Sequence, residues 1–126
     1  MARLVDSKDL AITCSAAVIA LTIYLGFFYR NRPAVRYDNH IRQAAERYNL
    51  DPALIKAVIW QESRFRPYVR GRAGEIGLMQ IREDAAFEWA EFEKMQNFDH
   101  EEITDPAKNI MCGSFYLSKV MKRYKA

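Results

Sequence analysis

The chain has few of the residues that build disulfide frameworks or metal centres. It contains two cysteines and two histidines among 126 residues. Cys14 lies in an apolar run and Cys112 in a predicted helix, so we do not expect them to pair. His40 and His100 have no cysteine or carboxylate at ligand spacing. The sequence therefore predicts neither a metal site nor a cofactor.

Glycine and proline are also scarce, and no charge of one sign dominates. Five glycines and four prolines, with no internal repeat, exclude a collagen-like, low-complexity or solenoid chain. The formal net charge is +3, and the lysines and arginines are dispersed among glutamates and aspartates. Such a pattern is typical of a solvated surface, so nucleic acid is not an expected partner.

One long apolar run lies near the start of the chain. Residues 10–29 carry no charge and have about the length that a helix needs to cross roughly 30 Å of hydrocarbon. We therefore expect a flank at 1–9, a transmembrane signal-anchor at 10–29 and a linker at 30–38. A cleaved signal peptide is the alternative, but no small-x-small cleavage site precedes the arginines that follow the run.

The charges on either side of this run bear on its orientation. Arg30, Arg32 and Arg36 follow it, whereas Arg3 and Lys8 precede it together with two aspartates. By the positive-inside rule, the domain after the run would stay on the cytoplasmic side.

Helical periodicity covers most of residues 39–126. Apolar residues at spacings of three and four predict helices over 39–48 and 52–63, a third from near 83, and a last one from 106 onward. Residues 64–77 hold too many glycines and prolines for a regular element, and 95–104 read as a polar loop. The sequence thus predicts one small, mainly helical domain.

Two of these helices carry matching start signals. Asp51 and Asp105 are each followed by proline, which suits an N-cap and the first helical position. The third helix is expected to present a core face formed by Phe87, Trp89, Ala90 and Phe92.

Glu62 stands out at the end of the predicted helix 52–63. It follows Val58 by one turn, beside the apolar stripe of that helix. A carboxylic acid among apolar groups can hold its proton near neutral pH, as general acid catalysis requires. A glutamate at a helix C-terminus also opposes the helix dipole. On composition alone, a glutamate reaching into solvent is the commoner case.

The stretch GEIGLMQI, residues 74–81, is the second candidate for chemistry. Gln80 offers an amide that can bind a sugar hydroxyl or N-acetyl group. Met79 can line a pocket or fill a gap in the core, which is the commoner case. Taken alone, the stretch also fits a buried strand.

Together these pieces resemble a known family. NLDPALIKAVIWQESRFRP, GRAGEIGLMQI and DPAKNIMCGSFYL occur in this order. They are similar to the lytic transglycosylase (SLT) domain, a relative of goose-type lysozyme, over about residues 41–124. The resemblance implies a mainly α, lysozyme-like α+β fold. It assigns the catalytic role to Glu62 and substrate binding to the neighbouring Ser63. A substrate-cleft motif corresponds to Gly77, Leu78, Met79 and Gln80, and Asn109-Ile110 matches a later helix.

The resemblance also implies a reaction on peptidoglycan glycan strands. Glu62 is expected to protonate the oxygen between N-acetylmuramic acid and N-acetylglucosamine, then to take the proton of the muramyl C6 hydroxyl as it attacks C1. The product is a 1,6-anhydro sugar. Because the nucleophile belongs to the substrate, one protein carboxylate suffices.

Glu75 departs from the family pattern, in which many relatives have alanine at this position. Its carboxylate is a candidate for substrate binding in the cleft. The favoured alternative is an ion pair with Arg70, Arg72 or Arg82.

The chain also differs from the family at its end. Family members usually continue into a helical stretch with an Ala-Tyr-Asn-Ala-Gly motif, whereas this sequence ends at Ala126. We therefore expect a domain truncated at its C-terminus. Its exposed apolar patch would be covered by self-association or a protein partner.

These observations predict a single-pass protein of the bacterial cytoplasmic membrane, anchored through residues 10–29. Its lysozyme-like domain, 39–126, is expected to face the periplasm or cell exterior, because the substrate exists only there. Two alternatives stay open: a non-catalytic peptidoglycan-binding or scaffold protein, and a lysozyme-type hydrolase.

Overall fold

The computed structural model describes residues 7–30 and 32–125, and within them leaves the side chains of residues 7–14, 16, 17, 29, 30 and 125 undescribed. The chain divides into two compact units, one ending at Arg36 and the other starting at Tyr37. Most of the flank predicted at 1–9 lies outside the described residues.

The first unit consists of two helices, α1 (Ser7–Arg30) and the one-turn α2 (Pro33–Arg36). The linker expected at 30–38 therefore contains helical turns. Apolar side chains of α1 are exposed, among them Ile23 and Phe27. Among the described residues, no helix meets the length and apolarity of a membrane span. The anchor predicted at 10–29 includes positions with undescribed side chains, so it stays a prediction.

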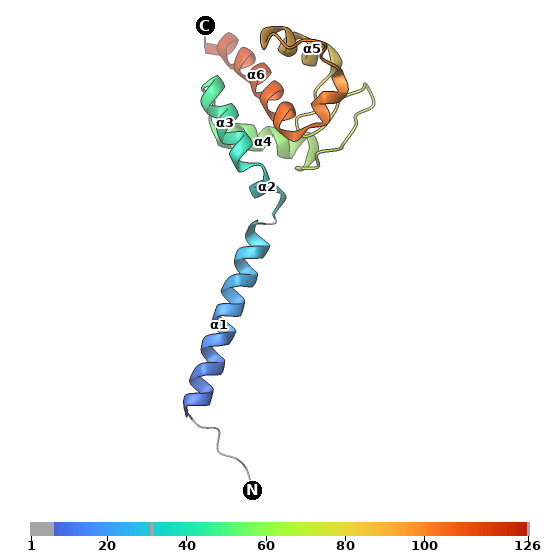
Figure 1. Ribbon diagram of the computed structural model, residues 1–126. Coiled ribbons are helices and arrows are strands. Elements are labelled where there is room, and N and C mark those ends of the chain that lie inside the picture. Colours follow the sequence, from blue (N-terminus) through green and yellow to red (C-terminus); the bar gives the residue numbers. More distant parts are fainter. Residues whose placement is uncertain (1–6, 31, 126) are drawn as a thin grey trace. The chain divides into compact units, whose positions relative to one another are not determined.

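The second unit is mainly helical, as predicted (Figure 1). Its helices are α3 (Asp38–Tyr48), α4 (Pro52–Ser63), α5 (Glu83–Phe92), the 3-10 helix η1 (His100–Thr104) and α6 (Pro106–Lys125). The long α6 packs against α3, α5 and η1, and α3 also packs against α4. Fully buried side chains at these contacts include Ile41, Ile55, Ile59, Ile103 and Ile110.

The predicted helix starts are confirmed by their caps. The Asp51 carboxylate accepts a hydrogen bond from the Ala53 backbone N–H at 2.7 Å. Asp105 does the same for Lys108 at 2.9 Å. The predicted polar loop at 95–104 is only partly correct, because η1 forms within it. Asp99 starts η1 with a capping box, a signal that the sequence contains as Asp-x-x-Glu.

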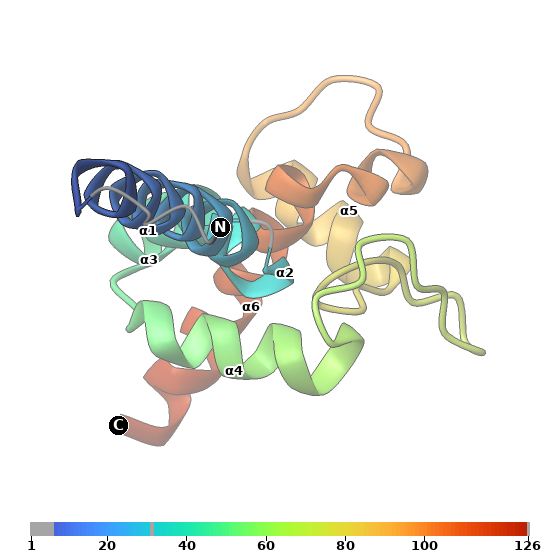
Figure 2. The ribbon, with the colours of Figure 1, turned by 90° about the horizontal axis from the view of Figure 1, so that it is seen from below.

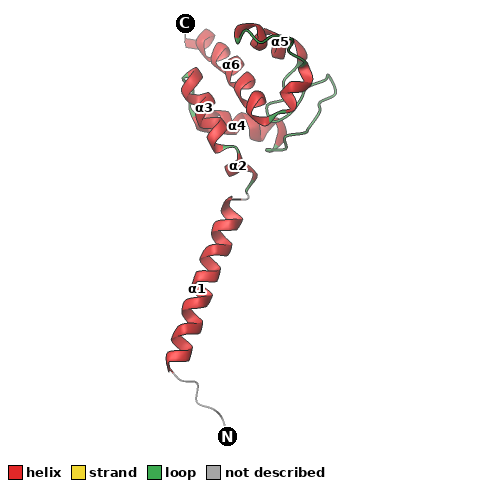
Figure 3. Ribbon diagram, viewed as in Figure 1, coloured by secondary structure: helices red, strands yellow, loops and turns green. Residues whose placement is uncertain are grey.

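Residues 64–82 cross from α4 to α5 without a regular strand in the described chain (Figure 3). Two isolated antiparallel bridges, Arg70 with Ile76 and Ile76 with Ile81, hold the crossing together. The absence of a regular element, predicted for residues 64–77, is confirmed, and the β part of the α+β fold is reduced to these bridges. Figure 2 shows the crossing projecting from the end of α4.

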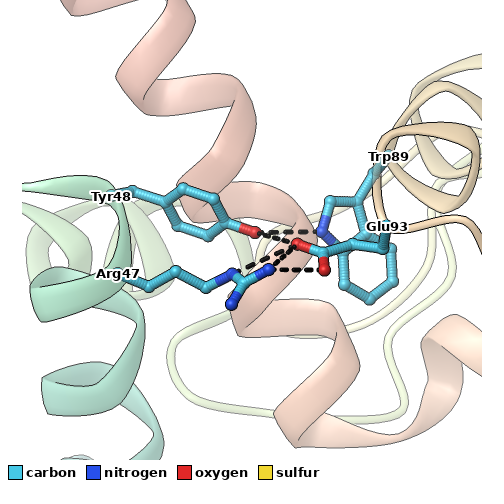
Figure 4. A network of polar contacts seen from close by, with 4 residues as sticks. All are labelled: Arg47, Tyr48, Trp89 and Glu93. Carbon is cyan, nitrogen blue, oxygen red and sulfur yellow. Dashed lines mark hydrogen bonds and ion pairs between the residues drawn. The ribbon is translucent and has the colours of Figure 1, made fainter.

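A polar network joins the ends of α3 and α5 (Figure 4). Arg47 donates to Glu93 at 2.7 and 2.5 Å. Tyr48 donates its hydroxyl proton to Glu93 at 3.0 Å and accepts from the Trp89 indole N–H at 3.1 Å. Burial is the main cause that raises the pKa of Tyr48, so the hydroxyl stays a donor at neutral pH. The network fixes α5 on the core.

The aromatic face predicted for α5 is wrong in part. Trp89 and Ala90 are buried, but Phe87 and Phe92 are largely exposed. Phe92 instead lies against Phe115 of α6, with ring centroids 4.7 Å apart. The helix is short, so only one side of it meets the core.

Candidate active site

Glu62 lies in the last turn of α4, and its side chain is exposed. Its neighbours on the inner side match the prediction, since Ile59 is fully buried and Val58 is half-buried. Within the described part of the chain, the Glu62 side chain makes no hydrogen bond or ion pair. The apolar enclosure expected around this carboxyl is therefore present on one side only.

Ser63 ties this helix end to the 77–80 segment. Its side chain is 1% exposed. The hydroxyl oxygen lies 2.8 Å from the Leu78 carbonyl oxygen and 3.1 Å from that of Ile59. The serine next to Glu62 thus holds the glutamate's helix end against the segment that carries the cleft motif. Its burial gives it a positioning role, in place of the substrate contact that we expected.

Asn109 of α6 holds the other side of the same segment. Its amide nitrogen donates to the carbonyls of Ile76 at 2.8 Å and Ile103 at 3.0 Å, and its oxygen accepts from the Met79 N–H at 2.8 Å. A Cβ atom at Gly77, whose φ is 81°, would lie 2.3 Å from the Asn109 amide nitrogen. Glycine is needed here both for the backbone conformation and for this close approach.

From the sequence alone, Asn109 only matches a position in a helix of the family. The signal that could have found its role is a polar residue within the apolar stripe of that helix, directly before the buried Ile110.

The remaining motif residues face different ways. Leu78 is fully buried, so it also supports the site from the interior. Met79 is 6% exposed and packs where Gly113 of α6 leaves room for it. Gln80 has a left-handed φ of 48°, and its amide nitrogen donates to the carbonyls of Gly77 at 2.9 Å and Val69 at 3.1 Å. Those bonds orient the Gln80 amide.

Glu75 does not make the ion pair that we favoured. It accepts a hydrogen bond from the Ala73 backbone N–H at 3.0 Å and fills the space beside Gly71. Arg70 pairs with Glu101 instead. Glu75 thus shapes its own turn, because a carboxylate two residues away reaches the backbone more easily than a distant guanidinium.

A groove of about 380 Å³ begins one turn before Glu62. It is bounded by side chains of α4, of the 77–80 segment, of the start of α5 and of α6. These are Val58, Met79, Gln80, Ile81, Arg82, Asp84, Ala85, Gly113, Tyr116, Leu117 and Val120. Its lining is mostly apolar, with polar groups at Gln80, Arg82, Asp84 and Tyr116.

Tyr116 is held in place at this groove. Its hydroxyl donates to Glu88, which also pairs with Lys119. Burial and this carboxylate raise the pKa of Tyr116 well above its ordinary value. The Lys119 and Tyr116 hydrogen bonds lower the pKa of Glu88. The phenol therefore stays protonated with its donor turned to Glu88.

A larger hollow, about 840 Å³, lies at the other end of α4, next to Asp51 and Leu54. Eight residues, roughly 12 Å along a helix, separate Leu54 from Glu62. The smaller groove is therefore the candidate site, because its lining comes within one turn of Glu62. Within the described chain, no group of three or more His, Cys, Asp or Glu side chains could hold a metal ion.

The second unit is thus a helical domain in which the helix end that carries a glutamate is tied to a Gly-Leu-Met-Gln segment. The chain belongs to the transglycosylase SLT domain family, whose pattern matches residues 39–126.

Relatives named as lytic murein transglycosylases are similar to this chain in sequence. The chain is 32% identical over 124 residues to membrane-bound lytic murein transglycosylase C of Edwardsiella ictaluri, covering 96% of this chain and 34% of that protein. It is 26% identical to membrane-bound lytic murein transglycosylase E of Buchnera aphidicola, covering 92% of this chain and 62% of that protein. The chain thus spans about a third of the first relative's length.

Solved structures share the fold. An inactive glutamate-to-glutamine mutant of lytic transglycosylase Slt from Pseudomonas aeruginosa superposes with a TM-score of 0.64 at 25% identity, covering 72% of this chain and 16% of that one. The 70-kDa soluble lytic transglycosylase of Escherichia coli gives a TM-score of 0.64 at 25% identity, covering 70% and 14%. The mainly helical, lysozyme-like fold predicted from the sequence is confirmed.

Proposed function

We propose that this protein is a peptidoglycan lytic transglycosylase in which Glu62 is the catalytic acid and base. The observation that carries the proposal is the Ser63 to Leu78 hydrogen bond of 2.8 Å, which joins the helix end of Glu62 to the wall of the groove. The names of the relatives from Edwardsiella and Buchnera support the substrate class. The inactive glutamate-to-glutamine mutant of the Pseudomonas relative supports an essential glutamate.

In this reaction Glu62 gives its proton to the glycosidic oxygen as the bond from C1 of N-acetylmuramic acid to that oxygen breaks. The C6 hydroxyl of the same sugar then attacks C1, and the Glu62 carboxylate takes the hydroxyl proton. One proton leaves Glu62 and one returns, so no water is consumed. The exposed Glu62 side chain reaches the bond freely, and a bound strand would exclude water from its open side.

We assign substrate contacts to the groove residues that stay accessible. Gln80 is half-buried, is fixed by its two hydrogen bonds and lines the groove, as Val58 does. Met79 contributes an apolar surface at the same wall. Gly77, Ser63 and Leu78 hold the wall from behind.

The test replaces Glu62 with glutamine, which keeps the shape and removes the transferable proton. We expect Glu62→Gln to abolish muropeptide release from purified sacculi while the helical circular-dichroism signal remains. Mass spectrometry of the wild-type products separates the mechanisms, because an anhydro product is lighter by one water than a hydrolase product. A reducing product would identify a hydrolase, and no product from wild-type protein would leave a binding or scaffold role.

We further propose that α1 anchors the protein in the bacterial cytoplasmic membrane as a single pass, with the second unit on the periplasmic or outer side. The uncharged run at 10–29 and the exposed apolar side chains of α1 support an apolar environment. The relatives named above are membrane-bound by name. Reporter enzymes fused after Ala126, active on one side of the membrane only, test this. A cytoplasmic result would contradict it.

A further inference from the structure

The turn directly after Glu62 is unusual in its backbone. Arg64 and Phe65 both adopt left-handed conformations, with φ of 51° and 60°. This conformation is uncommon for residues other than glycine. Backbone hydrogen bonds from Arg64 to Trp60 at 3.0 Å and from Arg66 to Ser63 at 3.1 Å close the turn. Phe65 enters the core at 7% exposure. The arginines on either side of it remain exposed.

Both arginines are positioned beside the helix end that carries Glu62. The Arg64 guanidinium lies over the Trp60 ring, 4.9 Å from its centroid, and Trp60 is 53% exposed. Arg66 donates from Nε to the Ser63 carbonyl at 3.1 Å. The stacking and the hydrogen bond each reduce the freedom of a long side chain. We call residues 64–66 the arginine turn.

Within the described residues, neither arginine of this turn has an acidic partner, whereas three other arginines of the domain do. Arg47 pairs with Glu93, Arg70 with Glu101 and Arg82 with Asp84. Glu75 is occupied by its own turn. The arginine turn therefore presents two uncompensated positive charges and an exposed indole, with Glu62 as the nearest carboxylate along the chain.

We propose that the arginine turn binds carboxylates of the peptide stems that a peptidoglycan strand carries. This inference rests on the proposed function, because a strand positioned at Glu62 brings its stems to the residues that follow. Guanidinium groups bind carboxylates through two parallel N–H donors, and the indole of Trp60 holds one of them in place. The turn thus selects glycan that still bears its acidic peptides.

The test measures co-sedimentation of the full-length protein, in mild detergent, with purified sacculi. The variant is Arg64→Gln/Arg66→Gln. The matched control is Arg42→Gln/Arg123→Gln, which removes the same charge from exposed positions of α3 and α6. We expect the variant to bind about fivefold more weakly at low salt and the control to bind like wild type. Wild-type binding should fall to the variant's level as salt rises from about 50 to about 300 mM.

Sacculi whose carboxylates have been amidated form the second arm. Wild type should bind them as weakly as the variant binds untreated sacculi. Equal binding of wild type and variant to untreated sacculi, or no effect of amidation, overturns the inference. The inference is also overturned if binding persists after the carboxylates are amidated but is lost when phosphate polymers are removed.

Melting temperature verifies that the variant folds, and Arg64→Lys/Arg66→Lys offers a second route, since it keeps the charge without the forked geometry. That variant should bind between wild type and the glutamine variant. Failure of the proposed function can be told apart from failure of this inference. If the protein binds sacculi through the turn but releases no anhydro product, the inference holds and the enzymatic role is wrong.

Discussion

Replacing Asn109 by alanine should destabilise the second unit more than any surface change near the site. The side chain is 1% exposed and makes three hydrogen bonds to backbone groups. The Ile76 carbonyl keeps a second donor, the Ile81 N–H at 2.9 Å. The groups left without their partner are therefore the Met79 N–H and the Ile103 carbonyl. Two unpaired buried groups and a small cavity amount to about 3–6 kcal/mol.

A double-mutant cycle measures the coupling free energy between Asn109 and Gly77 of the wall. Gly77→Ala alone must displace the Asn109 amide, 2.3 Å from the new Cβ, in addition to the penalty for a φ of 81°. In the Asn109→Ala background only the φ penalty and a tight 3.3 Å contact to the Pro67 carbonyl remain. We expect the double variant to be more stable than the sum of the single effects by about 1–2 kcal/mol.

Urea unfolding followed by tryptophan fluorescence suits this measurement, because Trp89 is 2% exposed and reports the core. The protein is kept full-length in mild detergent. Additive single effects, or a loss below about 1 kcal/mol for Asn109→Ala, would refute the view that this side chain holds the wall.

Three further outcomes are expected. Gly113→Ala should lower the free energy of unfolding by about 1–3 kcal/mol, because the new Cβ would lie 2.8 Å from the Met79 Cβ, and unchanged urea midpoints would contradict this. In a Cys14→Ser background, Cys112 should resist thiol reagents at neutral pH until urea unfolds the domain, because burial raises the pKa of its thiol to about 12. Fast labelling of the folded protein would contradict that burial. Hydrogen bonds from Lys119 and Tyr116 of α6 lower the pKa of Glu88, so its contribution to stability is present above the unfolded pKa of 4.5 and is lost as pH falls through the folded pKa. Glu88→Gln should therefore flatten the acid-unfolding curve in that range, and parallel curves for variant and wild type would argue against it.

Local signals predicted the elements of the second unit well. The Asp-Pro pairs and the apolar spacing defined α4 and α6 because caps and periodicity act within one or two turns. The exposed state of Phe92 could not be predicted, since it depends on which side of α5 meets α6. The partner of Arg70 was likewise decided by tertiary geometry, which placed Glu101 next to it.

The candidate site was also predictable only in part from the sequence. The motif indicated which residues belong together, but not which of them face solvent. Ser63 and Leu78 turned out to be interior supports, and Glu62 an open side chain, because the direction of a side chain depends on the packing of the whole unit. The catalytic role of Glu62 itself stays a prediction for the glutamine variant.

The single proton of the Ser63 hydroxyl has two carbonyl acceptors within reach, Leu78 at 2.8 Å and Ile59 at 3.1 Å. The hydroxyl can donate to only one of these carbonyls at a time or be shared between them. The Leu78 carbonyl is the nearer acceptor, so this one hydroxyl connects the last turn of α4 to the wall.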